Sequence, residues 1–151
     1  MHANTTIRQA THDDVDAVAP LFDSYRQFYG QEPDPAGARE FLAERLERGE
    51  STLFIAESAA HAAVGFTQLF PTFSSVVMAR TYVLNDLFVI PGFRRHGIAQ
   101  LLLTTAVAFC RSVGAVRVNL STAVGNAPAR ALYEASGWKR QTDYDVYVLK
   151  L

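Results

Sequence analysis

The chain has 151 residues, with a hydrophobic fraction of 49% and a charged fraction of 19%. This length fits a single domain spanning residues 1–151, and the composition excludes a disordered protein. With 14 Lys and Arg against 15 Asp and Glu, the net charge is -1, which gives no general attraction to nucleic acid or to an anionic membrane. Any anion-binding site must therefore be local.

The sequence shows neither a targeting segment nor a metal-binding motif. No apolar run approaches the roughly 20 residues that cross a bilayer, and the N-terminal stretch lacks the apolar centre of a signal peptide. We therefore expect a soluble, cytoplasmic protein without a membrane partner. The single cysteine, Cys110, cannot form an internal disulfide, and it makes no metal-ligand spacing with His2, His12, His61 or His96. We expect no metal cofactor.

The first third of the chain predicts a strand followed by two helices. TIRQA has the composition of a short strand, and Thr11 with Asp14 is an acidic variant of a helix-capping pair. Apolar residues at helical spacing then predict a helix that ends near Gly30. Asp34 followed by Pro35 predicts the cap and first turn of a second helix.

Strand composition dominates the middle of the chain. STLFIAES and AVGFTQLF surround a short loop and predict a hairpin whose second strand ends at Pro71. Residues 76–89, VVMARTYVLNDLFV, predict a long third strand region that is bent or interrupted.

The next segment predicts a well-marked helix that ends at Gly114. Cys110 lies on or beside its buried face, where a packed thiol is favoured over a nucleophile. The residues expected on that face are Ile98, Leu101, Leu102, Thr105, Phe109 and Val113.

The C-terminal segments predict a strand (VRVNLST), a short helix (APARALYEAS) and a final alternating strand (YDVYVLKL). This order of elements indicates an α+β domain with a mixed sheet.

The stretch NDLFVIPGFRRHGIAQLLL places arginines where a helix begins. The first N–H groups of a helix lack intrahelical partners and attract anions. Arg94 and Arg95 precede this helix, and the small residues Gly97 and Ala99 let a ligand approach the backbone. Neither an ATP-type loop nor a dinucleotide fingerprint is present. The turn predicts a phosphate or pyrophosphate site, although arginines at a helix start are often only solvated charges.

Two blocks carry a resemblance to a known family. VLNDLFVIPGFRRHGIAQLLL resembles the acetyl-CoA signature of the GNAT N-acetyltransferase superfamily, in which strand 4 is followed by [QR]-x-x-G-x-[GA]; here Ala99 stands where Gly is most frequent. NLSTAVGNAPARALYEASGW resembles the later N-x-x-A-x-x-x-Y-x-x-x-G-[FW] block. The pattern is closest to small diamine-acetyltransferase-like members. The resemblance implies a mixed, mostly antiparallel sheet of about six to seven strands, with strands 4 and 5 splayed, and about four flanking helices.

The resemblance also implies how acetyl-CoA is bound. Leu87, Phe88 and Val89 would pair with the pantetheine amides like an added strand. Asn126 and Ala129 would line the far side of the pantetheine arm. The N–H groups expected around the pyrophosphate are those of Arg94, Arg95, His96, Gly97, Ile98, Ala99 and Gln100.

Acetyl transfer to an amine needs a proton donor for the thiolate, an oxyanion donor and a base. Tyr133 occupies the family's tyrosine position and is the expected general acid; alternatively it is a helix aromatic that packs on the core. A bulge expected in strand 4 makes the Val89 N–H the expected oxyanion donor.

The base is expected at the start of the first block. Diamine acetyltransferases have a Glu-Asp pair where this chain has Asn85-Asp86. Since successive strand residues face opposite ways, only one of the two is expected to face the acceptor. Asp86 is the candidate base, but it could instead fix nearby backbone or a substrate ammonium. Asn85 could orient the amine without deprotonating it.

The acceptor site is expected in YRQFYGQEPD, which carries Tyr25 and Tyr29 among acidic residues. Aromatic and acidic groups would attract a cationic amine, although a plain solvated loop is the alternative. The segment PTFSSVVMART would form the other wall.

These features favour an acetyl-CoA-dependent N-acetyltransferase that acts on the primary amine of a small molecule, by direct attack in a ternary complex. The alternatives are a protein lysine or N-terminal acetyltransferase and a non-catalytic CoA-binding module. Nucleic-acid binding would need a broader basic surface. Members of the family often dimerise, and YDVYVLKL could support a homodimer.

Overall fold

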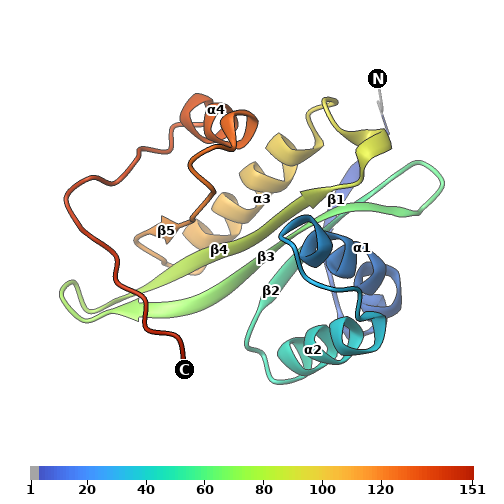
Figure 1. The fold of residues 1–151 in the computed structure, drawn as a ribbon, viewed down its shortest axis with the longest axis horizontal. Helices are drawn as coiled ribbons and strands as arrows, with labels where there is room; N and C mark the ends of the chain where they lie inside the picture. Colours follow the sequence, from blue (N-terminus) through green and yellow to red (C-terminus); the bar gives the residue numbers. More distant parts are fainter. Residues whose placement is uncertain (1–3) are drawn as a thin grey trace. The chain divides into compact units, whose positions relative to one another are not determined.

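A five-stranded sheet in the order β1-β2-β3-β4-β5 is the central feature of the chain up to Leu120 (Figure 1). The computed structural model describes residues 4–151, so His2 lies outside the described part. The strands are β1 (Thr6–Gln9), β2 (Thr52–Glu57), β3 (Ala63–Ser74), β4 (Ala79–Val89) and β5 (Val118–Asn119). The first four pair antiparallel and β5 pairs parallel with β4, which confirms the mixed sheet of an α+β fold. The expectation of six to seven strands is wrong, because residues 4–151 form five.

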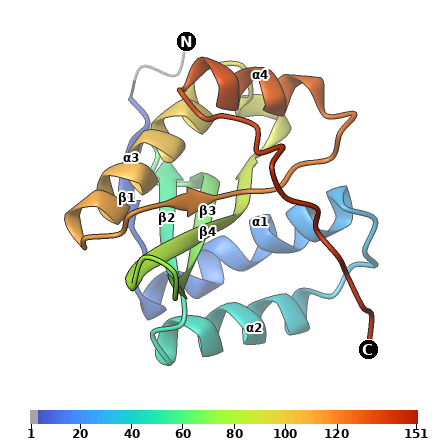
Figure 2. The ribbon, with the colours of Figure 1, turned by 90° about the vertical axis from the view of Figure 1, so that its left-hand side faces the viewer.

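Helices cover both faces of this sheet. The helices α1 (Val15–Phe28) and α2 (Pro35–Glu47) pack on one face, and α3 (Ile98–Ser112) packs on the other (Figures 1 and 2). Two short 3₁₀ turns, η1 (His12–Asp14) and η2 (Pro91–Phe93), precede α1 and α3. The predicted strand, helix and hairpin order is confirmed over this part of the chain.

The core between α1, α2 and the sheet is built from aliphatic and aromatic side chains. Leu42 of α2 and Phe66 of β3 are fully buried, and the ring of Phe22 of α1 lies 6.2 Å from that of Phe66. Phe88 of β4 joins the same cluster, with its ring 6.3 Å from that of Phe66. This core fixes the ends of β3 and β4 against α1.

The buried face of α3 is offset from the predicted one. Leu101 and Val113 are 46% and 44% exposed, whereas Leu103, Ala106 and Cys110 are buried. Apolar residues occupy most of α3, so their spacing alone does not decide which stripe meets the sheet. Cys110 is a packed thiol, as predicted, and burial raises its pKa to about 11.

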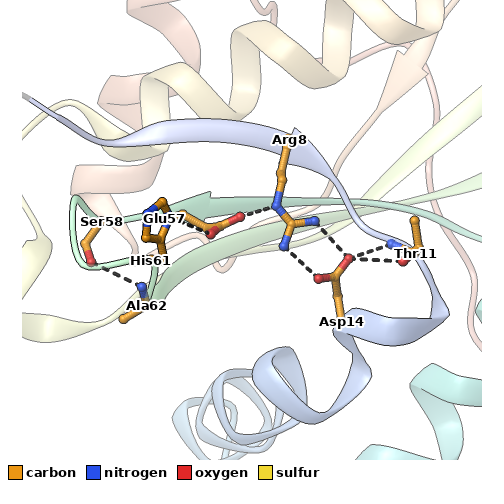
Figure 3. A network of polar contacts seen from close by, with 7 residues as sticks. All are labelled: Arg8, Thr11, Asp14, Glu57, Ser58, His61 and Ala62. Carbon is orange, nitrogen blue, oxygen red and sulfur yellow. Dashed lines mark hydrogen bonds and ion pairs between the residues drawn. The ribbon is translucent and has the colours of Figure 1, made fainter.

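An arginine ties the two strands and the turn at the N-terminal edge together (Figure 3). Arg8 of β1 donates to both carboxylate oxygens of Asp14, at 2.9 and 2.7 Å, and also to Glu57 of β2. Asp14 in turn accepts the N–H of Thr11 at 2.7 Å, which confirms the predicted capping pair. Arg8 holds the pKa of the Asp14 carboxyl below its ordinary value.

The strand β3 runs past Pro71 to Ser74, so the predicted end at Pro71 is wrong. The pairing of β2 with β3 stops at Leu69, while β4 pairs with β3 as far as Ser74. A proline, which lacks an N–H, is tolerated where one side of a strand has no partner.

Residues 121–151 form a second unit, which contains α4 (Ala127–Ala135). Asn126 caps this helix by accepting the Ala129 N–H at 3.3 Å. The predicted final strand is absent: the described residues 144–151 have no strand assignment, and Val146 and Val148 are 87% and 81% exposed. Alternation marks an amphipathic segment, but a strand also needs an edge to pair with.

Two searches of residues 4–151 bear on the remaining expectations. In that range no helix is long and apolar enough to span a membrane. In the same range no three or more His, Cys, Asp or Glu side chains are grouped so that they could hold a metal ion.

Candidate active site

A β-bulge in β4 organises the site. The pairing of β3 with β4 joins Gln68 to Asp86 and Leu69 to Leu84, so Asn85 is an extra residue without a partner on β3. Such a bulge locally breaks the in-and-out alternation of a strand. As a result Asn85 and Asp86 both line the same pocket, and the expectation that only one would face it is wrong.

Side-chain amides hold the Asp86 carboxylate in place. Asn85 Nδ2 donates to Asp86 Oδ1 at 2.8 Å, and Gln68 Nε2 donates to Asp86 Oδ2 at 2.5 Å. The backbone is fixed as well, because Thr67 Oγ1 donates to the Asp86 carbonyl at 2.8 Å and the Tyr25 hydroxyl donates to the Asn85 carbonyl at 2.9 Å. Asp86 itself is only 1% exposed.

Burial raises the pKa of the Asp86 carboxyl above its ordinary value, because removal from water disfavours the charged form. Hydrogen bonds from Asn85, Gln68 and Tyr25 lower the pKa, but burial is the larger effect. A carboxylate with a raised pKa is a better proton acceptor than an exposed one. The arrangement therefore suits a base.

A pocket of about 330 Å³ lies beside Asp86, on the face of the sheet covered by α1 and α2. This volume falls in the range of small-molecule sites. The pocket is lined by four aromatic residues, Phe22, Tyr25, Phe41 and Phe70. Its polar lining consists of Arg26, Asp34, Gln68, Asn85 and Asp86.

The charge around the pocket is acidic on balance. Arg26 lies in the wall, but its Nη1 donates to Asp23 Oδ1 at 2.8 Å and to the Glu32 carbonyl at 3.2 Å. Its charge is therefore neutralised within α1. Asp34 and Asp86 have no ion-pair partner among the described side chains. An organic cation is a better match for this pocket than an anion.

The segment from Tyr25 to Asp34 lies only partly in the wall of this pocket. Tyr25 and Asp34 line the pocket, whereas Tyr29 does not. Tyr29 is 51% exposed, and its ring lies 5.0 Å from that of Tyr25, so it packs beside a pocket residue. The expected second wall, residues 71–80, is mostly the exposed tip of the β3–β4 hairpin; the neighbouring Phe70 lines the pocket instead.

Gln68 was not predicted as a site residue. It lies between Phe66 and Phe70 in AVGFTQLF, where period-two spacing places all three on one face of β3. A single amide in an otherwise apolar buried strand is the signal that could have revealed it.

The edge of β4 next to β5 is without a strand partner where the resemblance expects acetyl-CoA. In the described chain β5 pairs with β4 only at Tyr82 and Val83. The Ile90 N–H donates to the Val64 carbonyl of β3 at 3.0 Å. Because N–H groups alternate along a strand, those of Leu87 and Val89 point away from β3, toward the unpaired edge.

The turn before α3 offers free helix N–H groups. The first helical hydrogen bond runs from the Leu101 N–H to the Gly97 carbonyl at 3.1 Å. Within residues 4–151 the N–H groups of Ile98, Ala99 and Gln100 have no backbone acceptor, and no side chain caps the helix. Gly97 adopts a positive φ of 80° and Arg95 one of 63°, which shapes the turn around the helix start.

The Arg94 side chain contacts the end of β4. Its Nε donates to the Val89 carbonyl at 2.7 Å, and its guanidinium lies 5.4 Å from the centre of the Phe88 ring. Its N–H donates to the Pro91 carbonyl at 3.3 Å. The Arg94 N–H thus has an acceptor within the turn, His96 is an exposed residue of the same turn, and the ring of N–H donors from Arg94 to Gln100 stays a prediction.

The expected bulge is present in β4 but four residues before Val89, and the register with β3 is unbroken from Asp86 to Val89. The other predicted residues, Asn126, Ala129 and Tyr133, belong to residues 121–151. There Asn126 and Ala129 form the cap of α4, and the ring of Tyr133 lies 6.1 Å from that of Trp138.

Known proteins share this sequence pattern. Residues 18–138 match the family described as "Acetyltransferase (GNAT) family". A relative in Bacillus subtilis (strain 168), called uncharacterized N-acetyltransferase YhfO, is 47% identical over 145 residues, which cover 96% of this chain and 97% of that protein. The chain belongs to the GNAT acetyltransferase family. A probable acetyltransferase of Haemophilus influenzae is 37% identical to this GNAT chain over 95 residues, covering 63% of the chain and 65% of the relative.

Solved structures agree with this membership. The crystal structure of a probable acetyltransferase superimposes on this GNAT chain with a TM-score of 0.92 at 39% identity, covering 97% of both chains. An aminoglycoside N-acetyltransferase, AAC(6')-Iy, solved in complex with CoA, gives a TM-score of 0.80 at 19% identity, covering 98% of this chain and 96% of that one, and shares the fold. The protein is thus an N-acetyltransferase of the GNAT fold.

Proposed function

We propose that this GNAT protein transfers the acetyl group of acetyl-CoA to the primary amine of a small molecule, by direct attack in a ternary complex. The observation that carries the proposal is the 330 Å³ pocket with the buried Asp86 carboxylate in its wall. Acetyl-CoA supplies the activated acetyl thioester. The residues of the chain bind the acceptor, orient it and remove its proton.

The pocket suits a cationic amine. Primary amines are mostly protonated at neutral pH, and aromatic faces attract an ammonium group by cation–π interaction. The rings of Phe22 and Phe41, 5.7 Å apart, and the ring of Tyr25 provide such faces. Asp86 then accepts the proton that the amine must lose, while the amide of Asn85 keeps the carboxylate oriented.

The residues around the cofactor fit acetyl-CoA. The unpaired edge at Leu87 and Val89 offers N–H groups to an amide-bearing chain, in the manner of an added strand. The uncapped N–H groups of Ile98, Ala99 and Gln100 suit a pyrophosphate. The neighbour solved in complex with CoA supports the choice of cofactor through its shared fold.

Tyr133 is the proposed general acid, by its match to the tyrosine of the GNAT motif. A tyrosine hydroxyl is protonated at neutral pH and can give its proton to a departing thiolate. Asn126 and Ala129 are proposed to line the pantetheine arm on the same basis. The kinship with diamine acetyltransferases also remains a proposal, because Asn85 replaces the acidic residue of that group.

The test mixes purified protein, acetyl-CoA and a panel of acceptors while free thiol is measured. The panel contains alkyl, aryl-alkyl and diamine compounds, an aminoglycoside, and peptides with a lysine or a free N-terminus. We expect thiol release that depends on a small primary amine, with initial-rate lines that intersect when both substrates are varied. Release with peptides alone would favour the protein acetyltransferase, and no release with any acceptor would favour a CoA-binding module.

A further inference from the structure

Gln68 places an unpaired hydrogen-bond acceptor in the wall of the acceptor pocket. Its side chain is fully buried, with 0% exposure, and its Oε1 has no hydrogen-bond partner within residues 4–151. Buried side-chain oxygens in folded proteins are nearly always paired with protein, water or a ligand. Gln68 Oε1 is therefore expected to accept a hydrogen bond from a donor outside the chain.

The other end of the amide fixes its orientation. Gln68 lies directly opposite Asp86 in the β3–β4 register, and its Nε2 donates to Asp86 Oδ2 at 2.5 Å. An ionised carboxylate only accepts hydrogen bonds, so the amide nitrogen must face Asp86 and the oxygen must face away from it. Gln68 and Asp86 both line the pocket, so the amide and the carboxylate lie next to each other in its wall.

We propose that Gln68 is a specificity-determining residue: its Oε1 accepts one N–H of the acceptor nitrogen while Asp86 takes another, so that the pocket selects primary over secondary amines. This inference rests on the proposed function, since it assigns a role in the same pocket. It names the residue that would make the pocket prefer a primary amine, a preference that the Asp86 carboxylate alone does not define.

The geometry of the reacting nitrogen gives the reason. A neutral primary amine has four tetrahedral directions: its substituent, its lone pair and two N–H bonds. The lone pair forms the new N–C bond as the thioester C–S bond breaks and the sulfur leaves with the electron pair. Asp86 first passes the proton of the bound ammonium to solvent, and it then takes one N–H proton of the attacking nitrogen. The other N–H pairs with Gln68 Oε1, and the leaving thiolate takes its proton from Tyr133. A secondary amine has one N–H, so it must leave either the base or the buried oxygen without a partner.

The experiment compares a primary amine that the enzyme accepts with its N-methyl derivative. The wild-type kcat/KM should favour the primary amine by roughly 10- to 100-fold. In Gln68→Met, which keeps the volume but removes both polar atoms, the preference should fall to about threefold or less. A ratio of two substrates on one enzyme cancels any loss common to both, such as a less ionised Asp86.

Controls separate this effect from general damage. Gln9→Met makes the same chemical change at an exposed position of β1 and should keep the wild-type ratio. Gln68→Asn, which withdraws the oxygen by one methylene, replaces Gln68→Met if that variant does not fold. An unchanged ratio in the folded Gln68 variant would overturn the inference and leave the proposed function intact.

A binding measurement covers the opposite case, in which the enzyme acetylates no amine of the panel. Calorimetry without acetyl-CoA compares a primary ammonium with its N,N-dimethyl derivative, which has a single N–H. The wild type should bind the dimethyl compound roughly tenfold more weakly than the primary ammonium, and Gln68→Met should bind the two compounds equally. These results would support the role of Gln68 even though the proposed function had failed. Equal binding of the two compounds to the wild type, or no binding of either, would refute it.

Discussion

Asp86 is a buried carboxylate that forms no ion pair within the described part of the chain. Its folded-state pKa is raised above the ordinary value of 3.8. The native state therefore binds a proton more readily than the unfolded chain does. This stabilisation is complete below the unfolded pKa and is lost as the pH rises through the raised folded pKa. At neutral pH the charge at Asp86 works against folding.

The first prediction concerns Asp86→Asn. The variant should lose at least 100-fold in kcat, because no base remains. It should also be more stable than the wild type at pH 7, by about 1 kcal/mol, since no charge is buried and the Gln68 amide can turn over so that its Oε1 accepts from the new amide. Activity assays and thermal unfolding measure the two effects. A variant that is both inactive and less stable would mean that Asp86 has a structural role.

The second prediction is the pH dependence of kcat/KM. The rate should rise with pH through the raised pKa of Asp86, because only the ionised carboxylate can take a proton. The acid limb should therefore lie above the range of an ordinary aspartate. In Asp86→Asn this limb should disappear from the residual rate. Its persistence in the variant would assign the limb to another group.

Some residues of the candidate site could be predicted from the sequence, and others could not. Asp86 is predicted as the base because the family resemblance places this carboxylate on the strand before the arginine turn. The sequence does not predict that Asn85 and Asp86 face the same pocket. A bulge depends on how a strand pairs with its neighbour, and the sequence of one strand does not specify that pairing. Gln68 was missed because its importance comes from the residue opposite it on β4.

Among the secondary-structure elements, β1, η1 and β2 are joined by Arg8. Its guanidinium is 47% exposed, so solvent screens its ion pairs, but it bridges two carboxylates that are each only 13% exposed. The pKa of Asp14 is lowered by this contact. The stability that Asp14 contributes is therefore present above its unfolded pKa and is lost as the pH falls through the lowered folded value.

The third prediction follows for Arg8→Met. The free energy of unfolding at pH 7 should fall by about 1 kcal/mol or less, which lowers Tm by roughly 2–4 °C. The difference from the wild type should shrink at pH values below the folded pKa of Asp14. Arg39→Met is the matched control, because within residues 4–151 Arg39 pairs only with the exposed Asp16 and should have a smaller effect. Equal losses in the two variants would contradict a special role for the Arg8 contacts.

At this scale most elements were predictable, and their pairing was not. The helices were marked by caps and apolar spacing, and Asp34 caps α2 as expected, by accepting the Gly37 N–H at 3.0 Å. The final strand was predicted from alternation in Tyr144–Leu151, but a strand exists only where another edge pairs with it. The end of β3 was misplaced at Pro71 for the same reason, since the tolerance for proline depends on which side is paired.

For the molecule as a whole, the net charge of -1 means that attraction of an anionic cofactor must come from local groups. The uncapped start of α3 supplies such groups in the unit up to Leu120, and Tyr133 belongs to residues 121–151. The homodimer expected from the family stays a prediction.

The fourth prediction tests Tyr133 as the general acid. Tyr133→Phe should lower kcat by roughly 10- to 100-fold and change the KM for acetyl-CoA much less, because only proton donation is removed. Tyr144→Phe is a matched control at a residue that is 77% exposed, and it should behave like the wild type. An equal loss in kcat and in cofactor affinity would indicate packing instead.

The bulge at Asn85 has a consequence for the core as well as for the site. Tyr82 packs against Phe109 of α3, while Phe88 packs against Tyr25 and Phe66 on the opposite face of the sheet. Tyr82 and Phe88 are an even number of positions apart, and in an unbroken strand they would share a face. One inserted residue therefore lets a single strand supply aromatic rings to both layers of helices. Removing it would make the residues on one side of the insertion exchange faces. The pocket residues and the hydrophobic packing of β4 therefore cannot change independently at this position.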